Sequence, residues 1–436
     1  MECQKVAMEM ESQTHLQAQP QDPKPKGTTF LRTCFNGLNA LSGVGILSIP
    51  FALSQGGWLS LALLLLVAVL CFYTGLLLKR CMDSDLHIRT YPDIGERAFG
   101  YKGRALVSIF LYMELYLVAV EFLILEGDNL DKLFPHTAFR IGSLEIGGKE
   151  AFILLSGLVI LPTTWLKSLG VLAYVSVGGV LASIVLAVCV FWVGAVDGVG
   201  FHESGRILRL EGLPTAISLF TFCYCGHAVF PTLCNSMKDR TQFSKVIKTS
   251  IISHFELRNF VIAYAQVLLV CFVVSTLSYG SMAVMGYLMY GEHLKSQVTL
   301  NLPIAKISSQ VAIYTTLVNP VAKYAVIIGP VATAVEEKFV FENSRALCIL
   351  VRTVILISTV IVALTVPFFG YVMAFIGSSL SVIASLILPC LCYVRINKSA
   401  RKVGLELMLI VGILVVATVV GIVGTYTSVK QIVKQL

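Results

Sequence analysis

Long apolar runs recur along this chain, and they constrain its fold more than any other feature. Each run is near 20 residues long, about the length that an α-helix needs to cross the hydrocarbon core of a bilayer. The composition agrees, since 56% of the 436 residues are hydrophobic and 13% are charged, whereas soluble domains carry about 25% charged residues. One soluble core could not bury so much apolar surface. The chain is therefore predicted to be an all-α integral membrane protein.

Eleven runs fit membrane spans, and a polar, glutamine-rich segment precedes them. We expect residues 1–27 to form a disordered cytosolic tail, because they contain no apolar stretch. The spans would fill a transmembrane domain at residues 28–428. They are predicted at residues 30–55, 58–78, 105–125, 151–166, 169–195, 213–233, 261–290, 307–335, 346–366, 369–394 and 404–427.

The distribution of lysine and arginine predicts the orientation in the membrane. The loop at residues 79–104 is rich in both, whereas the loop between the fifth and sixth spans holds only Arg206 and Arg209. Because basic loops stay in the cytosol, the N-terminus is expected there and the C-terminus on the opposite, lumenal side. The formal net charge of +8 follows from this topology and does not indicate nucleic-acid binding.

Two of the predicted spans contain residues that interrupt a helix. The first carries SGVGILSIP at residues 42–50, and the sixth carries CYCGHAVFP at residues 223–231. Glycine weakens a helix and proline removes a backbone donor. Since lipid cannot satisfy the freed backbone groups, such interruptions face protein or a wet cavity. The alternative interpretation is a pair of kinked packing helices.

Paired interruptions in corresponding spans are typical of secondary transporters built from inverted repeats. The repeat halves would be residues 28–195 and 213–394, with an extra helix at residues 404–427. The N-terminal ends of half-helices offer amides to a carboxylate, and the C-terminal ends offer carbonyls to a cation or an ammonium group. An amino-acid zwitterion presents both charges, which favours an amino acid as the substrate.

Five stretches carry a resemblance to a known family. They are NALSGVGILSIPFALSQGGW (39–58), TYPDIGERAFG (90–100), CYCGHAVFPTL (223–233), YGSMAVMGYLMYGE (279–292) and VNPVAKYA (318–325). They resemble the amino acid/auxin permease family, and within it the vacuolar amino-acid transporters of plants and yeast. The resemblance covers about residues 28–428.

This resemblance implies an APC-type (LeuT-like) fold, in which eleven helices form a 5+5 inverted repeat with broken helices 1 and 6. It also implies amino-acid transport across the membrane of an acidic compartment such as the vacuole, by proton-coupled antiport. The expected substrates are neutral amino acids.

Substrate-binding residues are predicted at both interruptions, where the resemblance places the unwound backbone. Their backbone groups would bind the carboxylate and the ammonium of the substrate, with Phe222 and Tyr224 as pocket walls. The candidates are Ser42, Gly43, Val44, Gly45 and Ile46 in the first span, and Phe222, Cys223, Tyr224, Cys225, Gly226 and His227 in the sixth.

Acidic residues inside the third span are candidates for proton coupling. Glu114 and Glu121 lie seven residues apart and therefore share one helix face. Intramembrane acids usually face the bundle interior or a cavity, so either one could carry the coupled proton. Glu126 and Asp128 lie nearer the lumenal end and are expected to be solvated.

Other polar residues keep the coupling ion open. His227 could relay protons, since histidine titrates near neutral pH, or it could be a neutral ring bonded to a freed carbonyl. Lys323 lies near the centre of the eighth span. Its ammonium could replace the ion that spans 1 and 8 hold in sodium-coupled members of the fold, or it could pair with carbonyls or a carboxylate of the third span. Thr315, Thr316 and Asn319 on the same span could instead ligate sodium, as in a sodium-coupled symporter.

The sequence does not indicate an enzyme. It contains no Gly-x-Ser-x-Gly, His-Glu-x-x-His or P-loop motif, and its two Cys-x-Cys pairs lack the neighbouring ligands of a zinc site. We therefore expect no cofactor, no metal and no obligate protein partner beyond the substrate, protons and the lipid bilayer. The alternative from another functional class is an amino-acid sensor with a transporter fold.

Residues 247–267 depart from the family pattern, because about twenty extra residues precede the seventh span there. With its lead-in from residue 259, that span would be about 48 Å long as a helix, against a hydrocarbon core of about 30 Å. Part of the segment is expected on the cytosolic surface. Our hypothesis is that the segment is the product of a retained intron and not a functional loop.

Overall fold

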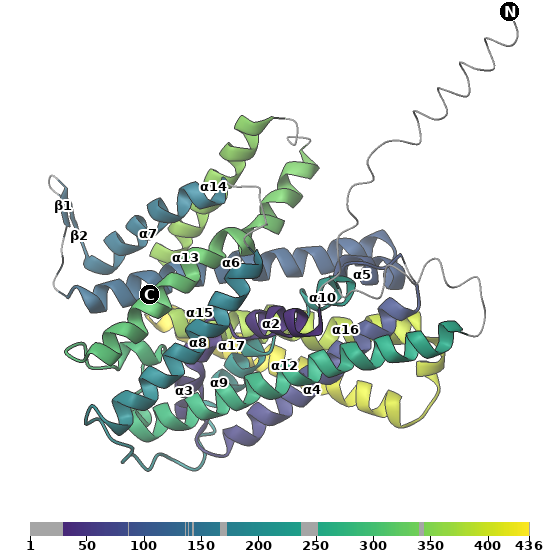
Figure 1. The fold of residues 1–436 in the computed structure, drawn as a ribbon, viewed down its shortest axis with the longest axis horizontal. Coiled ribbons are helices and arrows are strands. Elements are labelled where there is room, and N and C mark those ends of the chain that lie inside the picture. Colours follow the sequence, from purple (N-terminus) through teal and green to yellow (C-terminus); the bar gives the residue numbers. More distant parts are fainter. Residues whose placement is uncertain are drawn as a thin grey trace, which may run out of the picture.

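The fold is a bundle of helices with one short β-hairpin (Figure 1). The computed structural model describes residues 29–85, 87–135, 137, 139–141, 144–165, 172–236, 252–339 and 344–435. The predicted tail at residues 1–27 lies outside these ranges. The hairpin pairs β1 (Phe139–Ile141) with β2 (Leu144–Ile146) in antiparallel register.

The helices follow one another along the chain with short connections. In the first half they are α2 (Phe30–Leu41), α3 (Gly45–Gly56), α4 (Ser60–Asp83), α5 (Tyr91–Phe99), α6 (Tyr101–Leu133), α7 (Gly148–Thr164) and α8 (Leu172–Ala195). In the second half they are α9 (Leu213–Cys223), α10 (Phe230–Ser236), α12 (Ile252–Tyr290), α13 (Ile307–Lys338), α14 (Arg345–Thr365), α15 (Phe369–Ile376), α16 (Leu388–Ile396) and α17 (Leu405–Gln435). Two π-helical segments, η4 (Gly377–Ser381) and η5 (Ile383–Ile387), join α15 to α16.

The predicted class of all-α membrane protein is confirmed. Within the described ranges, eight helices are long and apolar enough to cross a bilayer, and the bent pair α2 and α3 raises the number to nine. Helical structure is found at every predicted span, but α7 has 17 residues and α9 has 11, which is short for a complete span. The count of eleven therefore stays a prediction.

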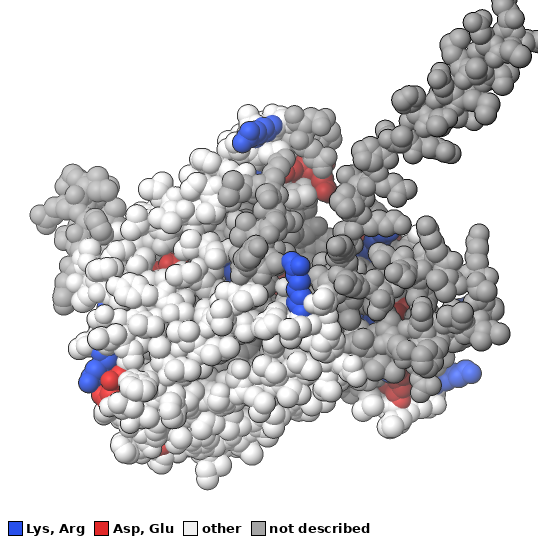
Figure 2. All heavy atoms as spheres, in the orientation of Figure 1, with Lys and Arg blue, Asp and Glu red and all other residues white. Residues whose placement is uncertain are grey.

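Burial separates the interior of the bundle from its periphery. The stretch Phe369–Ile396 is 72% buried over its most apolar window, whereas α14 and α17 are each 22% buried. Figure 2 shows a broad face on which uncharged side chains predominate. Apolar side chains on such a face fit contact with lipid, so the polar residues that bear on function are to be sought inside the bundle.

The first interruption lies earlier in the chain than the proline suggested. Residues 42–44 separate α2 from α3, and the two helix axes meet at a bend of 51°. Pro50 lies within α3, which continues through it as far as Gly56. The glycine-rich stretch, and not the proline, therefore produces the break.

Helix α12 is longer than the predicted seventh span. It runs for 39 residues from Ile252, which is about 58 Å at 1.5 Å per residue. The predicted start at residue 261 is thus wrong, because the backbone of residues 252–260 continues the helix. Residues 247–251 of the extra segment lie outside the described ranges.

Candidate functional site

The two interruptions lie against each other in the interior of the bundle. We call residues 42–44 the first break and residues 224–229, between α9 and α10, the second break. A Cβ atom on Gly45 would lie 2.6 Å from the Cys223 Sγ atom, and one on Gly226 would lie 3.0 Å from a methyl carbon of Leu41. Only glycine permits these approaches. The ends of α2 and α9 therefore meet where the sequence predicted the substrate site.

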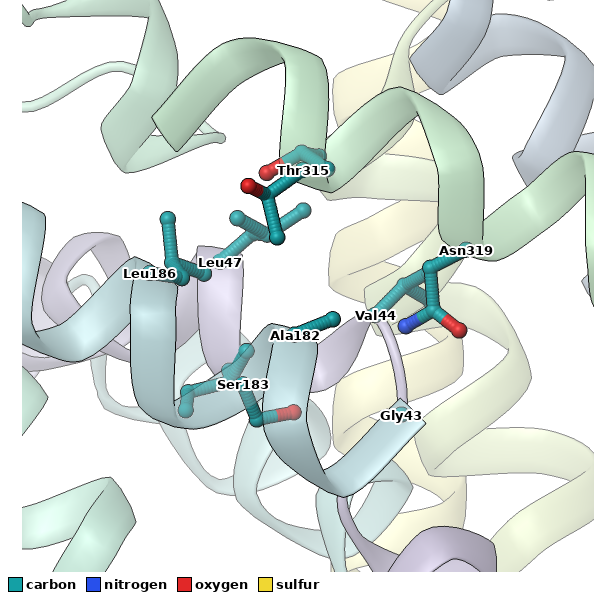
Figure 3. Close-up of a pocket in the computed structure, with 10 residues that line it drawn as sticks. Gly43, Val44, Leu47, Ala182, Ser183, Leu186, Thr315 and Asn319 are labelled. Atoms are coloured by element: carbon teal, nitrogen blue, oxygen red, sulfur yellow. The ribbon is translucent and has the colours of Figure 1, made fainter. Parts of the chain in front are cut away.

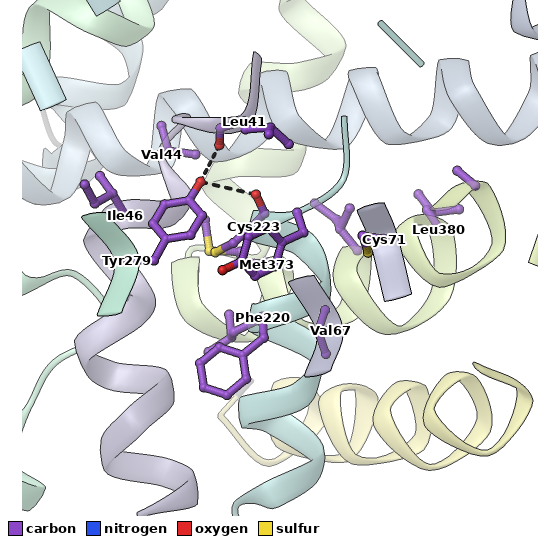
Figure 4. Close-up of a cluster of buried hydrophobic side chains, with 14 of the residues drawn as sticks. Leu41, Val44, Ile46, Val67, Cys71, Phe220, Cys223, Tyr279, Met373 and Leu380 are labelled. Atoms are coloured by element: carbon purple, nitrogen blue, oxygen red, sulfur yellow. Dashed lines mark hydrogen bonds between the residues drawn. The ribbon is translucent and has the colours of Figure 1, made fainter. Parts of the chain in front are cut away.

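Tyr279 of α12 joins the two half-helices, as the dashed lines of Figure 4 show. Its hydroxyl oxygen lies within hydrogen-bond distance of the Leu41 carbonyl and 3.2 Å from the Cys223 carbonyl. The sequence analysis missed this role. A tyrosine in the middle of a predicted span, inside one of the family motifs, was the available indication.

A small cavity lies beside the first break, between α3, α8 and α13 (Figure 3). Its volume of about 20 Å³ accommodates about one water molecule. It brings together six predicted residues, and α8 adds three that the sequence analysis missed. The lining residues are Gly43, Val44, Ile46, Leu47, Ala182, Ser183, Leu186, Thr315, Thr316 and Asn319.

The cavity lining is uncharged, and the backbone of the first break is accessible from it. A Cβ atom on Gly43 would meet no heavy atom within 4 Å. The Ser42 hydroxyl does not line the cavity, because it donates to the Ser183 oxygen at 2.9 Å, and Ser183 in turn donates to the Gly179 carbonyl. Across the described residues, no three His, Cys, Asp or Glu side chains form a group that could hold a metal ion.

Lys323 is buried one helical turn beyond Asn319. Its Nζ atom would lie 3.0 Å from a Cβ atom on Gly179 of α8, and the Asn39 side-chain oxygen approaches the same point. No carboxylate of the described residues lies within 4 Å of Nζ. Pairing with a carboxylate of the third span is thus not observed. The ammonium group lies between α8 and α13, close to the cavity.

The aromatic residues of the sixth span do not line this cavity. Tyr224 donates a hydrogen bond to the Thr276 hydroxyl at 2.9 Å and stacks on Phe272, so its side chain points to α12. Phe222 packs against Gly377 of η4. Both predicted pocket walls therefore hold the second break in place within the bundle, at least in this closed arrangement.

Glu114 is the predicted carboxyl that contacts a break. Its Oε1 atom accepts hydrogen bonds from Ser381 of η4 at 2.5 Å and from the Cys225 thiol at 3.1 Å. Ser385 of η5 donates to the same sulfur at 2.9 Å. Helix α6, the second break and both π-helical segments thus meet at one polar cluster. Such π-helical segments occur frequently at functional sites.

The other acids of α6 differ from Glu114. Glu121 is fully buried, and neither of its carboxylate oxygens has a hydrogen-bond partner among the described residues. The expectation of solvated Glu126 and Asp128 was wrong. Glu126 is 3% exposed, and Asp128 pairs with Lys149 at 2.5 Å and accepts from Gln297. These acids are buried because α7 and the segment after α12 pack over the end of α6.

His227 is fully buried, and its Nε2 atom lies 2.9 Å from the Thr74 hydroxyl of α4. That hydroxyl has the carbonyls of Leu70 and Cys71 as acceptors at 3.0 and 3.1 Å. Its oxygen is therefore available to accept the hydrogen of Nε2. The ring fastens the second break to α4, and a hydroxyl is the hydrogen-bonding partner in place of the expected freed carbonyl.

Comparison with known proteins assigns the chain to a group. The family model described as transmembrane amino acid transporter protein matches residues 26–263 and 256–430. The chain is 50% identical over 408 residues to amino acid transporter AVT1I of Arabidopsis thaliana, which covers 93% of this chain and 96% of that protein. It is 49% identical over 415 residues to amino acid transporter AVT1J of the same plant, covering 94% and 93%.

A third relative, amino acid transporter AVT1C of Arabidopsis thaliana, is 45% identical over 417 residues, covering 95% of this chain and 72% of that protein. The two parts of the family match meet at residues 256–263. This junction falls inside the segment at residues 247–267 that departs from the family pattern.

Proposed function

The chain belongs to the transmembrane amino acid transporter family, and on that premise we propose that it is a secondary active transporter of neutral amino acids. It would move them across the membrane of an acidic organelle, the vacuole, in exchange for protons. The observation that carries the proposal is the contact between the two breaks, with Gly45 against Cys223. Two helix interruptions that meet inside a membrane bundle are suited to bind a zwitterion.

The helix ends at the breaks supply groups for both charges of the substrate. Helix α3 begins at Gly45 next to the cavity, and the amides of its first turn favour a carboxylate. The carbonyl ends of α2 and α9 favour an ammonium group. The uncharged cavity lining supports a neutral side chain on the substrate. Because the cavity has room for about one water molecule, an amino acid would enter only when the breaks separate.

Glu114 is the best-supported carrier of the coupled proton. An ionised carboxylate only accepts hydrogen bonds, whereas a protonated carboxyl also donates one. Protonation of Glu114 would therefore change its bond to Cys225 and its bond to Ser381. Proton binding would act directly on the second break and on the π-helical segments. Glu121 has no hydrogen-bonding partner through which it could act in this way.

The experiment is amino-acid uptake into liposomes that contain the purified protein and are acidic inside. We expect concentrative uptake of neutral amino acids, which a protonophore abolishes. Binding without flux would favour the sensor alternative and contradict the transporter proposal.

Sodium-coupled symport is the second candidate, and the cavity at the first break favours it. Thr315, Thr316 and Asn319 offer oxygen atoms there, beside the backbone of Gly43. Lys323 argues for protons, because its ammonium lies close by and would repel a second cation. Uptake that requires a sodium gradient and persists with a protonophore would decide for the symporter.

The proposed topology adds α7 and the pair α9 and α10 to the nine spans, which gives eleven spans in a 5+5 inverted repeat plus α17. An odd number of spans places the N-terminus in the cytosol and the C-terminus in the lumen. Protease protection of a tag at each end of the chain, in sealed vacuolar vesicles, tests this arrangement. Two tags on the same side would require an even number of spans.

A further inference from the structure

Two half-helices end on the hydroxyl group of Tyr279. Leu41 is the last residue of α2, and Cys223 is the last residue of α9. The final carbonyls of a helix lack partners inside it and carry the negative end of its dipole. Both carbonyls lie within hydrogen-bond distance of the same phenol oxygen. One donor on α12 therefore serves the ends of both interrupted spans.

The bond is exclusive, because a phenol has one donor hydrogen and two carbonyls share it. Tyr279 is fully buried, so bulk water does not replace the hydroxyl. If α2 and α9 separate, at least one carbonyl loses this donor in a dry environment. The contact therefore favours the arrangement in which both helix ends stay together.

The surroundings of Tyr279 add to this contact. The Tyr224 ring packs edge-on against the Tyr279 ring with centroids 5.5 Å apart, and its hydroxyl donates to Thr276, one turn earlier on α12. Gly45 lies directly on Cys223. One face of α12 thus contacts the end of α2 and the start of the second break at the same time.

We propose that Tyr279 is a positioning residue for transport, whose hydroxyl holds the C-terminal ends of α2 and α9 together so that the two breaks open and close as one unit. The proposal rests on the proposed function, because the groups that Tyr279 aligns are those assigned to the amino acid. Tyr279 itself does not bind the substrate. It fixes the distance between the backbone groups of the two breaks.

The test is the variant Tyr279→Phe, which removes the hydroxyl and keeps the ring. One readout is the KM for amino-acid uptake in liposomes, which we expect to rise about tenfold, as for the loss of one buried hydrogen bond. The second readout is the rate at which N-ethylmaleimide modifies Cys223, followed by mass spectrometry of its peptide. Cys223 is 4% exposed and packs on Gly45, so its modification reports separation of the breaks.

Tyr324→Phe is the matched control. The Tyr324 hydroxyl is equally buried, but it lies 2.6 Å from Thr359 and away from both breaks. We expect this variant to keep the wild-type KM and the wild-type rate of Cys223 modification. Thermal stability of both variants, measured in detergent, separates a general loss of stability from a change in position.

The readouts distinguish the outcomes. An unchanged KM and an unchanged modification rate in Tyr279→Phe overturn the proposal, and so does a lower thermal stability with both of these unchanged. If the wild type transports no amino acid but Cys223 is modified faster in Tyr279→Phe, the proposed function fails while the contact between the breaks is upheld.

A second variant applies if Tyr279→Phe does not accumulate in the membrane. Incorporation of 3,5-difluorotyrosine at position 279 keeps the size of the side chain and strengthens the hydroxyl as a donor. Slower modification of Cys223 then supports the proposal, and an unchanged rate contradicts it.

Discussion

The two breaks interrupt their spans in different ways. The first break has three residues, and its single described side-chain hydrogen bond runs from Ser42 to Ser183. The second break has six residues, and three of its side chains bind three different helices. Tyr224 binds α12, Cys225 binds α6 and His227 binds α4.

This difference indicates a division of labour between the breaks. Small residues leave the backbone of the first break accessible from the cavity, as Gly43 shows. The second break exposes little backbone, but any movement of α4, α6 or α12 acts on it through a hydrogen bond. We expect the first break to contribute more to substrate binding and the second to respond to protonation and helix movement.

The largest expected effect is that of Gly45→Leu, which acts on the contact between the breaks. A Cβ atom there already meets Cys223 at 2.6 Å. Overpacking costs about 1–3 kcal/mol for small additions, and a whole leucine side chain is larger, so we expect uptake in vesicles to fall about a hundredfold or more. The control is Gly329→Leu on α13, where an added Cβ meets nothing within 4 Å. Near-normal uptake by a correctly localised Gly45→Leu protein would remove the basis of the comparison.

The next largest effect is expected for Glu114→Gln, which tests whether the second break responds to protons. Hydrogen bonds to a charged carboxyl contribute about 1.5–3 kcal/mol, so we expect uptake against a gradient to fall about tenfold or more. Exchange of labelled for unlabelled amino acid at equal pH should continue, because the amide still accepts hydrogen bonds from Ser381 and Cys225.

Glu121→Gln is the matched variant for Glu114→Gln, since both acids lie on α6 and are buried. We expect it to affect coupling less, because Glu121 has no hydrogen bond to either break among the described residues. Equal loss of proton coupling in both variants would mean that contact with Cys225 is not what matters.

A smaller effect is expected for Thr74→Val, which separates an anchoring role of His227 from a proton relay. The substitution keeps the shape of the side chain and removes the oxygen that faces Nε2. Leaving one buried donor unsatisfied costs about 1–3 kcal/mol, which should appear as a lower melting temperature in detergent. The pH profile of uptake should be unchanged, and a shifted profile would favour the relay.

The smallest effect is expected for deletion of residues 247–267. Thr276 and Tyr279, through which α12 contacts the breaks, both follow this segment in the chain. Doubling the length of a loop costs only about 0.6 kcal/mol, so we expect the shortened protein to transport at least as well, within about threefold. A loss of transport at equal abundance in the membrane would show that the segment is functional, against the retained-intron hypothesis. Sequencing of the transcript across this junction is the independent check.

Local pattern was sufficient for the class of protein and for the positions of the breaks. Apolar runs near 20 residues long predict helices in a bilayer because lipid leaves the backbone no other partner than itself. Glycine at residues 43 and 45 predicted an interruption of the first span, and the interruption lies at residues 42–44. Pro50 misled the prediction, because a helix can continue through a proline when its neighbours pack around it.

The partners of the polar side chains were decided by the tertiary structure alone. Tyr279 meets Leu41 across 238 residues of chain, and Glu114 meets Ser381 across 267. Glu121, two turns from Glu114 on the same helix, bonds to neither break, although the sequence offers no reason to prefer one acid over the other. A helix face follows from local spacing, but its contacts depend on how the helices cross. Helix packing therefore determines which buried polar groups of this chain reach the breaks.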